Sequence, residues 1–145
     1  MMPPTDSAQH RRANWIRALE QIHDPQSRLG WILDQARSIA PLPVHLRTEP
    51  HLFPGCRVRL WWIPSFHNGQ CEFHTDSDSV TLKALTHLIA QICGKSTPSE
   101  IAELDFSFLE TLGVLRQLAE SRQATLRRII EATHEFTSLH RAKNL

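Results

Sequence analysis

The sequence of 145 residues has few glycines and no long apolar run. Its five glycines are not clustered, so there is no glycine-rich phosphate loop, and there is no GxSxG nucleophile elbow. No segment approaches the roughly 18 consecutive apolar residues of a membrane span. The first residues also lack the charged and apolar regions of a secretory signal. We therefore expect a cytoplasmic protein with no membrane partner.

The chain also has no large excess of charge of either sign. Sixteen basic and 15 acidic side chains leave a formal net charge of +1. Such a balanced chain produces no bulk field that would recruit a phosphate backbone. The composition therefore disfavours a nucleic-acid partner.

Cysteines are few, and their spacing carries no paired motif. Cys56, Cys71 and Cys93 form no CxxC pair and are odd in number, which argues against a disulfide framework. The nine histidines include no HExxH and no Cys/His group at zinc-ligand spacing. We expect three free thiols, no metal and no cofactor bound to this chain.

The remaining composition is that of an ordinary globular protein. Apolar residues make up 41% of the chain and charged residues 21%, which is enough for one core. We expect a single domain over residues 13–140. Residues 1–12 are polar and contain proline, so they are expected to form a flexible N-terminus.

Hydrophobic periodicity predicts helices on both sides of a β-rich centre. Helical spacing of apolar residues recurs in residues 15–22 and 25–39, with Asp24 as the cap of the second helix. The expected fold class is α+β. A small antiparallel three-stranded sheet would be flanked by N-terminal and C-terminal helices in two layers.

The C-terminal half contains the clearest helix signals. The strongest amphipathic pattern covers residues 78–93, where Gly94 would end the helix. Thr97 begins a capping box, and Asp105 would cap another short helix. Ser121 is expected to cap a long last helix, on which Arg127 and Arg128 face outward.

The central stretch, residues 53–63, places a cysteine before the most strand-like run of the chain. Alternation directs Leu60 and Trp62 to one face of that strand. Gly55 permits a tight turn and Pro54 stiffens the approach to it. Cys56 is therefore expected at the tip of a loop fixed by a rigid sheet, where its thiol can touch a partner.

A hairpin is expected to follow this loop. Residues 64–69 read as its turn, residues 70–76 as the returning strand and residues 51–53 as a third strand. In this register Arg57 faces Asp76.

Cys56 would then lie beside Asp76, Ser77 and Asp78, which open the helix of residues 78–93. The positive end of that helix and the nearby Arg57 favour the thiolate, the form that attacks sulfur. The alternative interpretation is a small buried hydrophobic side chain at a strand start, because free cysteine is commonly buried.

A set of short motifs occurs in one order over about residues 31–136. The motifs are Gly55-Cys56, Trp61, Asp76-Ser77-Asp78 with Lys83 and Leu85, Thr97-Pro98-Ser99-Glu100-Ile101, Leu112-Gly113 and Ser121-Arg122. This ordered set resembles the SufE family of sulfur-acceptor proteins. The resemblance implies a SufE/NifU-like two-layer fold. It also implies that Cys56 accepts sulfur from a SufS-like, pyridoxal-phosphate-dependent cysteine desulfurase and passes it to an iron-sulfur scaffold.

This chain departs from the family pattern near the cysteine. Family members usually carry serine where Val58 stands and glycine where Ala84 and Thr125 stand. Pro54 replaces a residue that can donate a backbone hydrogen bond. These departures leave the thiol in place and concern the shape of its surroundings.

Arg122 is a further candidate because its charge in the first turn of a helix opposes the helix dipole. The resemblance implies that it contacts the desulfurase near the acceptor cysteine. The residues alone equally allow an exposed arginine with its charge in water. Arg57 and Arg59 leave the same two interpretations open.

Two other functions are compatible with the sequence. The chain could be a binding module that docks on a desulfurase and modulates it without carrying sulfur. Less favoured is a cysteine hydrolase in which His74 or His51 serves Cys56 as the base, since such a pair must lie within hydrogen-bond reach. On the favoured hypothesis the chain is a sulfur-transfer accessory protein rather than a free-standing enzyme.

Overall fold

The computed structural model of the protein describes residues 7–143. In this range the sheet is formed by the hairpin that follows Cys56. Its strands are β1 (Leu60–His67) and β2 (Gln70–Ser77). Within that range the α-helices are α1 (Ala8–Glu20), α2 (Pro25–Ala36), α3 (Val80–Cys93), α4 (Pro98–Ala102), α5 (Phe108–Thr111) and α6 (Glu120–Lys143). Single 3-10 turns are η1 (Val44–Leu46), η2 (Glu49–His51) and η3 (Leu115–Gln117). The expected α+β class is confirmed.

The hairpin turn is shorter than predicted, and the predicted register is therefore wrong. Asn68 and Gly69 alone form the turn, with φ of 53° and 77°, and His67 pairs with Gln70. Two consecutive residues with positive φ match the twist of the flanking strands. Pro64 lies inside β1, a strand with an open edge where its missing N–H costs no ladder bond.

In the observed register Asp76 lies opposite a different residue than predicted. This residue pairs with Trp61, whereas the prediction placed it opposite Arg57. Cys71 likewise lies opposite Phe66. The shift carries Cys56 beyond the end of the paired region, so the sheet does not hold it directly.

The third strand is reduced to a single bridge in the described part of the chain. Leu52 bridges Trp61, and the N–H of Phe53 donates to the carbonyl of Leu60 at 2.7 Å. Pro50 and Pro54 bracket this segment and have no N–H to donate, which prevents a longer ladder. The sheet has two strands here, and the predicted three-stranded sheet is not confirmed.

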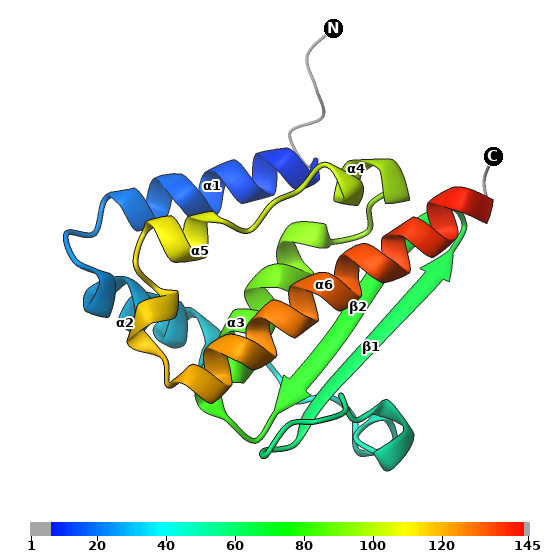
Figure 1. Cartoon of the computed structure of the whole chain (residues 1–145), viewed down its shortest axis with the longest axis horizontal. Coiled ribbons are helices and arrows are strands. Elements are labelled where there is room, and N and C mark those ends of the chain that lie inside the picture. The colour runs from blue at the N-terminus through cyan, green and yellow to red at the C-terminus, as the bar shows by residue number, and fades with distance from the viewer. Residues whose placement is uncertain (1–6, 144–145) are drawn as a thin grey trace, which may run out of the picture.

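Helices cover one face of the hairpin (Figure 1). Leu60 and Trp62 belong to the buried core, as the alternation predicts, and Trp61 is buried as well, outside that core cluster. Thr75 of β2 donates to Thr86 of α3 at 3.1 Å, and Phe136 of α6 packs edge-on against Phe73. The resulting layer of α3 and α6 on the sheet positions the loop that carries Cys56.

The first helix begins earlier than predicted. Residues 8–12, assigned to a flexible N-terminus, are helical and follow a cap at Ser7, while residues 1–6 lie outside the described range. The Nε of Arg11 donates to the carbonyl of Ile92 at 3.0 Å, which anchors this turn to α3. The domain boundaries at 13 and 140 stay a prediction.

Most capping signals are confirmed. The side chain of Asp24 accepts from the N–H of Ser27 at 2.9 Å, Thr97 forms the capping box, and Gly94 ends α3. Two predicted starts are wrong by one or two residues. Ser79 caps α3, and α6 begins at Glu120, before the predicted cap Ser121.

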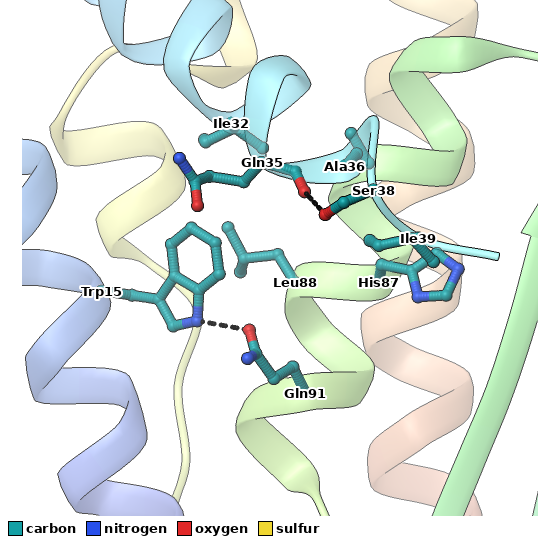
Figure 2. Close-up of a pocket in the computed structure, with 10 residues that line it drawn as sticks. Trp15, Ile32, Gln35, Ala36, Ser38, Ile39, His87, Leu88 and Gln91 are labelled. Carbon is teal, nitrogen blue, oxygen red and sulfur yellow. Dashed lines mark hydrogen bonds between the residues drawn. The ribbon is translucent and has the colours of Figure 1, made fainter.

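A cavity of about 400 Å³ remains where α1, α2 and α3 meet. Figure 2 shows Trp15 donating to Gln91 across it, over 3.0 Å, with His87 farther along its wall. Of the described residues that line it, none is Asp, Glu, Lys or Arg, and Cys56 does not line it. The cavity is therefore separate from the predicted site.

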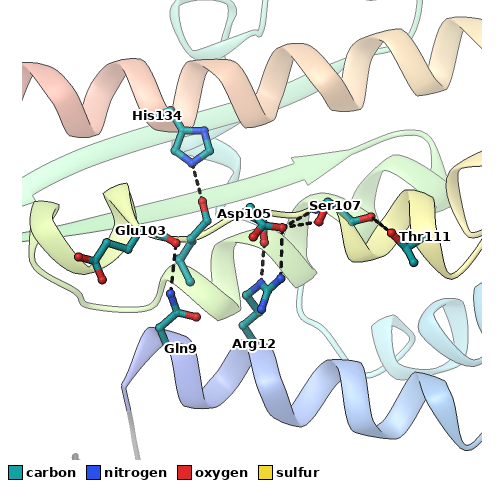
Figure 3. Close-up of polar contacts among 8 residues, drawn as sticks. Gln9, Arg12, Glu103, Asp105, Ser107, Thr111 and His134 are labelled. Atoms are coloured by element: carbon teal, nitrogen blue, oxygen red, sulfur yellow. Dashed lines mark hydrogen bonds and ion pairs between the residues drawn. The ribbon is translucent and has the colours of Figure 1, made fainter.

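Polar contacts join α1 and α6 to the segment before α5 (Figure 3). The Nε of Arg12 donates to the carbonyl of Asp105 at 2.6 Å, and His134 contacts the carbonyl of Leu104 at 3.0 Å. Asp105 accepts from the N–H of Ser107 at 3.1 Å, and α5 begins one residue later. Among the described helices, none has the length and apolar character needed to cross a membrane.

Candidate functional site

Cys56 lies in a loop that leaves the sheet and returns to it. The bond from Phe53 to Leu60 closes the base of this loop, and Pro54 and Gly55 form a turn within it. Gly55 has a φ of +82°, in the region that favours glycine. Cys56 follows this turn and is half-buried. Cys56 is therefore at a loop tip, as predicted, and the residue is partly exposed.

The contact made by the thiol comes from α6. The Sγ of Cys56 lies 3.8 Å from the Oγ1 of Thr125, which it can reach as a weak donor. The hydroxyl of Thr125 donates in turn to the carbonyl of Ser121 at 3.0 Å. The sequence predicted a neighbour at the start of α3, and the register error explains the difference.

Arg128 of α6 also holds this loop, and the sequence analysis did not predict that contact. Its Nη2 donates to the carbonyl of Pro54 at 2.6 Å, and its guanidinium carbon lies 4.9 Å from the ring centre of Phe53. The sequence predicted an outward-facing Arg128. The signal that could have found it is its spacing, because Thr125 stands three residues earlier on the same face of the helix.

Asp76 supports the site from inside the protein. It is 3% exposed, and its carboxylate accepts from the N–H groups of Leu42 at 2.9 Å and Ser77 at 2.8 Å. The ammonium of Lys83 lies 3.6 Å from the carboxylate. A buried carboxylate with these partners fixes the connector before Cys56 to the end of β2.

Ser77 and Asp78 hold the end of the loop at which β1 begins. The hydroxyl of Ser77 and the N–H of Asp78 both donate to the carbonyl of Arg59, at 2.7 and 3.0 Å. The carboxylate of Asp78 accepts from the Nε of Arg59 at 2.6 Å. The acidic cluster thus holds Arg59, three residues after the cysteine, and the predicted pairing of Arg57 with Asp76 is wrong.

Arg57 and Arg122 are placed differently from Arg59. Arg57 is exposed in the loop beside Cys56, and Arg122 is half-buried in the first turn of α6. Neither guanidinium has a hydrogen-bond or ion-pair partner among residues 7–143. Arg122 stands three residues before Thr125, which places it on the side of α6 that faces the loop.

The other two cysteines are buried in the core. Burial raises the pKa of Cys71, and it raises the pKa of Cys93 to about 12. Cys71 and Cys93 are both fully covered. Cys56 is thus the least buried of the three cysteines in this structure.

Among the described residues we find neither a cluster of metal-binding side chains nor a histidine bonded to Cys56. No group of three or more His, Cys, Asp or Glu side chains is placed to hold a metal ion in this range. His51 contacts the carbonyl of Leu46 at 2.8 Å, and His74 lies 3.4 Å from Glu72. The hydrogen bond of the Cys56 thiol is with Thr125, and neither histidine is bonded to it.

Comparison with known protein families shows to which family the chain belongs. The profile described as "SufE: Fe-S metabolism associated domain" matches residues 13–137. The chain belongs to the SufE family. The resemblance predicted from the ordered motifs is confirmed, and SufE membership associates the chain with iron-sulfur metabolism.

Curated relatives of this SufE chain differ greatly in length. It is 26% identical to a quinolinate synthase from the chloroplast of Arabidopsis thaliana over 76% of its own length, but it spans 16% of that protein. It is 26% identical to an uncharacterized SufE-like protein of Synechocystis, covering 76% of this chain and 69% of that one. A cysteine desulfuration protein SufE from Wigglesworthia glossinidia brevipalpis is 24% identical, covering 77% of this chain and 79% of that protein.

A solved structure has a similar overall fold. The solution structure of a hypothetical protein from Thermus thermophilus superposes with a TM-score of 0.71, covering 98% of this chain and 99% of that one. The two sequences are 14% identical, so the likeness concerns the fold alone.

Proposed function

We propose that this chain is a sulfur acceptor that carries sulfane sulfur on Cys56. A pyridoxal-phosphate-dependent cysteine desulfurase supplies the sulfur, and an iron-sulfur scaffold receives it. The observation that carries the proposal is the contrast among the cysteines. Cys56 is half-buried at a loop tip, whereas Cys71 and Cys93 are buried. Membership of the SufE family supports the same assignment.

The chemistry is a thiol exchange that needs no external oxidant. The thiolate of Cys56 attacks the terminal sulfur of a persulfide on the desulfurase, forming a new S–S bond. The old S–S bond breaks, and the desulfurase cysteine leaves as a thiolate. The proton lost by Cys56 passes to solvent or to that leaving thiolate. The chain supplies access and orientation, so we regard it as an accessory protein that works in the cytoplasm.

The surrounding residues have separate roles in this proposal. Gly55 forms the tight turn before the thiol, while Asp76, Ser77 and Asp78 shape the base of the loop. Arg57 and Arg122 bind the desulfurase. Their guanidinium groups have no hydrogen-bond or ion-pair partner within the described chain, which supports this role.

Intact mass after reaction tests the proposal. The protein is mixed with a SufS-like desulfurase and cysteine, and the mass of one added sulfur is expected on the wild type. Cys56→Ser should gain none, while Cys93→Ala should gain one if it stays folded. A gain that survives Cys56→Ser, or no gain on the wild type, would reject the carrier role.

A docking role is the second candidate, favoured by the half-buried state of the thiol and its contact with Thr125. In that case the chain binds a desulfurase and changes its turnover without accepting sulfur. Stimulation or inhibition would then persist in Cys56→Ala. Loss of the effect in Cys56→Ala, together with sulfur on the wild type, would exclude it.

A further inference from the structure

Arg128 contacts three successive residues of the loop that leads to the thiol. It donates to the carbonyl of Pro54 at 2.6 Å and lies over the ring of Phe53, 4.9 Å from its centre. A Cβ atom built on Gly55 would lie 2.9 Å from its Nη1, so the guanidinium lies directly against that residue. Cys56 is the next residue along the chain.

These contacts hold the middle of the loop, whose ends are fixed elsewhere. The bond between Phe53 and Leu60 fixes the base, and the bonds from Ser77 and Asp78 to Arg59 fix the return. Between these points the contacts of the loop with α6 come from Thr125 and Arg128. The bond donated by Arg128 is charge-assisted and therefore the stronger of the two, because a thiol is a weak donor.

We propose that Arg128 is a positioning residue that keeps the Cys56 loop against α6 in the free protein. While it holds Pro54, the thiol rests beside Thr125 and is half-buried. When it releases Pro54, the turn swings outward and presents the thiol to a larger partner. This proposal rests on the proposed function only for its effect on sulfur transfer, since the position of the loop is a property of the free chain.

The rate of Cys56 alkylation in the folded protein, without any desulfurase, measures how often Arg128 releases Pro54. Arg128→Met removes the charged donor, and we expect Cys56 to react at least about tenfold faster with iodoacetamide. Arg127→Met is the matched control, because Arg127 is the adjacent residue and its nearest carboxylate, that of Glu110, is 4.0 Å away. Equal rates in the two variants would overturn the proposal.

The buried cysteines report whether the variant is folded. Cys71 and Cys93 should stay unlabelled in Arg128→Met while Cys56 reacts faster. If they become labelled, Arg128→Lys and Phe53→Leu replace that variant, since each keeps part of the contact. Both should raise the rate by a smaller factor, and wild-type rates in both would overturn the proposal.

Sulfur transfer gives a second measurement that a general loss of stability would not reproduce. Because a larger open fraction raises apparent affinity, the desulfurase concentration at half-maximal transfer should fall in Arg128→Met. The rate at saturating desulfurase should be unchanged, since the loop is open in both complexes. A change confined to the saturating rate would contradict the role. If the wild type accepts no sulfur, the carrier function fails and alkylation alone decides the role of Arg128.

Discussion

The Oγ1 of Thr125 lies 3.8 Å from the Sγ of Cys56, although the two residues are 69 positions apart in the sequence. The contact joins the thiol loop to the second turn of α6. The resemblance to the SufE family implies glycine at this position, and here Thr125 places a hydroxyl next to the thiol. The departure affects the surroundings of the Cys56 thiol directly.

Replacing Thr125 with valine tests this contact. Valine has a similar shape but no hydroxyl, so the contact with the Cys56 thiol and the bond to the carbonyl of Ser121 are both lost. We expect the free energy of unfolding to change by less than about 1 kcal/mol and Cys56 alkylation to rise about two- to fivefold. Thr133→Val is the control, because Thr133 makes the same hydroxyl-to-carbonyl bond at 2.8 Å farther along α6. A similar rise in Thr133→Val would remove the explanation.

Thiol labelling in the native state should be selective. Burial raises the pKa of Cys93 to about 12, and it also raises that of Cys71. At about pH 8 their reactive thiolate fractions are small and their side chains are covered. Peptide mapping after a short treatment with iodoacetamide should find the label on Cys56, and on all three cysteines only after denaturation. Native labelling of Cys93 at the rate of Cys56 would contradict the structure.

Removing the carboxylate of Asp76 should destabilise the protein strongly. Asp76→Ala leaves the N–H of Leu42 without its acceptor and the ammonium of Lys83 without its carboxylate. We expect a loss of about 2–4 kcal/mol in the free energy of unfolding, measured by urea denaturation. Asp78→Ala is the control, because its pair with Arg59 is exposed and should cost less than about 1 kcal/mol. Equal losses would show that burial of Asp76 is not decisive.

Acid should lower the free energy of unfolding because His87 is buried. Burial lowers the pKa of His87 below its ordinary value of 6.5, against the opposing effect of the Asp76 charge. Since the folded pKa is the lower one, the unfolded chain takes up the proton first as the pH falls. The stabilising contribution is therefore complete above pH 6.5 and is lost as the pH drops through the folded pKa.

Urea denaturation of the wild type and His87→Gln at about pH 7.5 and about pH 5 measures this effect. The wild type should lose more stability between these two conditions than His87→Gln does. His45→Gln, on the exposed turn η1, should behave like the wild type. An identical loss in the wild type and His87→Gln would exclude this origin of acid sensitivity.

The sequence by itself determined the local elements and the family. Caps at Asp24 and Thr97 and the stop at Gly94 depend on residues within a few positions, so they are readable along the chain. The turn that carries Cys56 is equally local, because Pro54 and Gly55 restrict the backbone there. The ordered motifs that identify the family also need no three-dimensional information.

Tertiary structure decided the register and the neighbours of the thiol. A turn was predicted within residues 64–69, but the number of residues in the turn depends on how both strands pack against α3 and α6. The contacts of Arg128 with Pro54 and of Thr125 with Cys56 each join residues about 70 positions apart, and no local rule specifies such pairs. Packing of α6 against the sheet brings them together, and for that physical reason the sequence predicted the loop that carries Cys56 but not the helix that holds it.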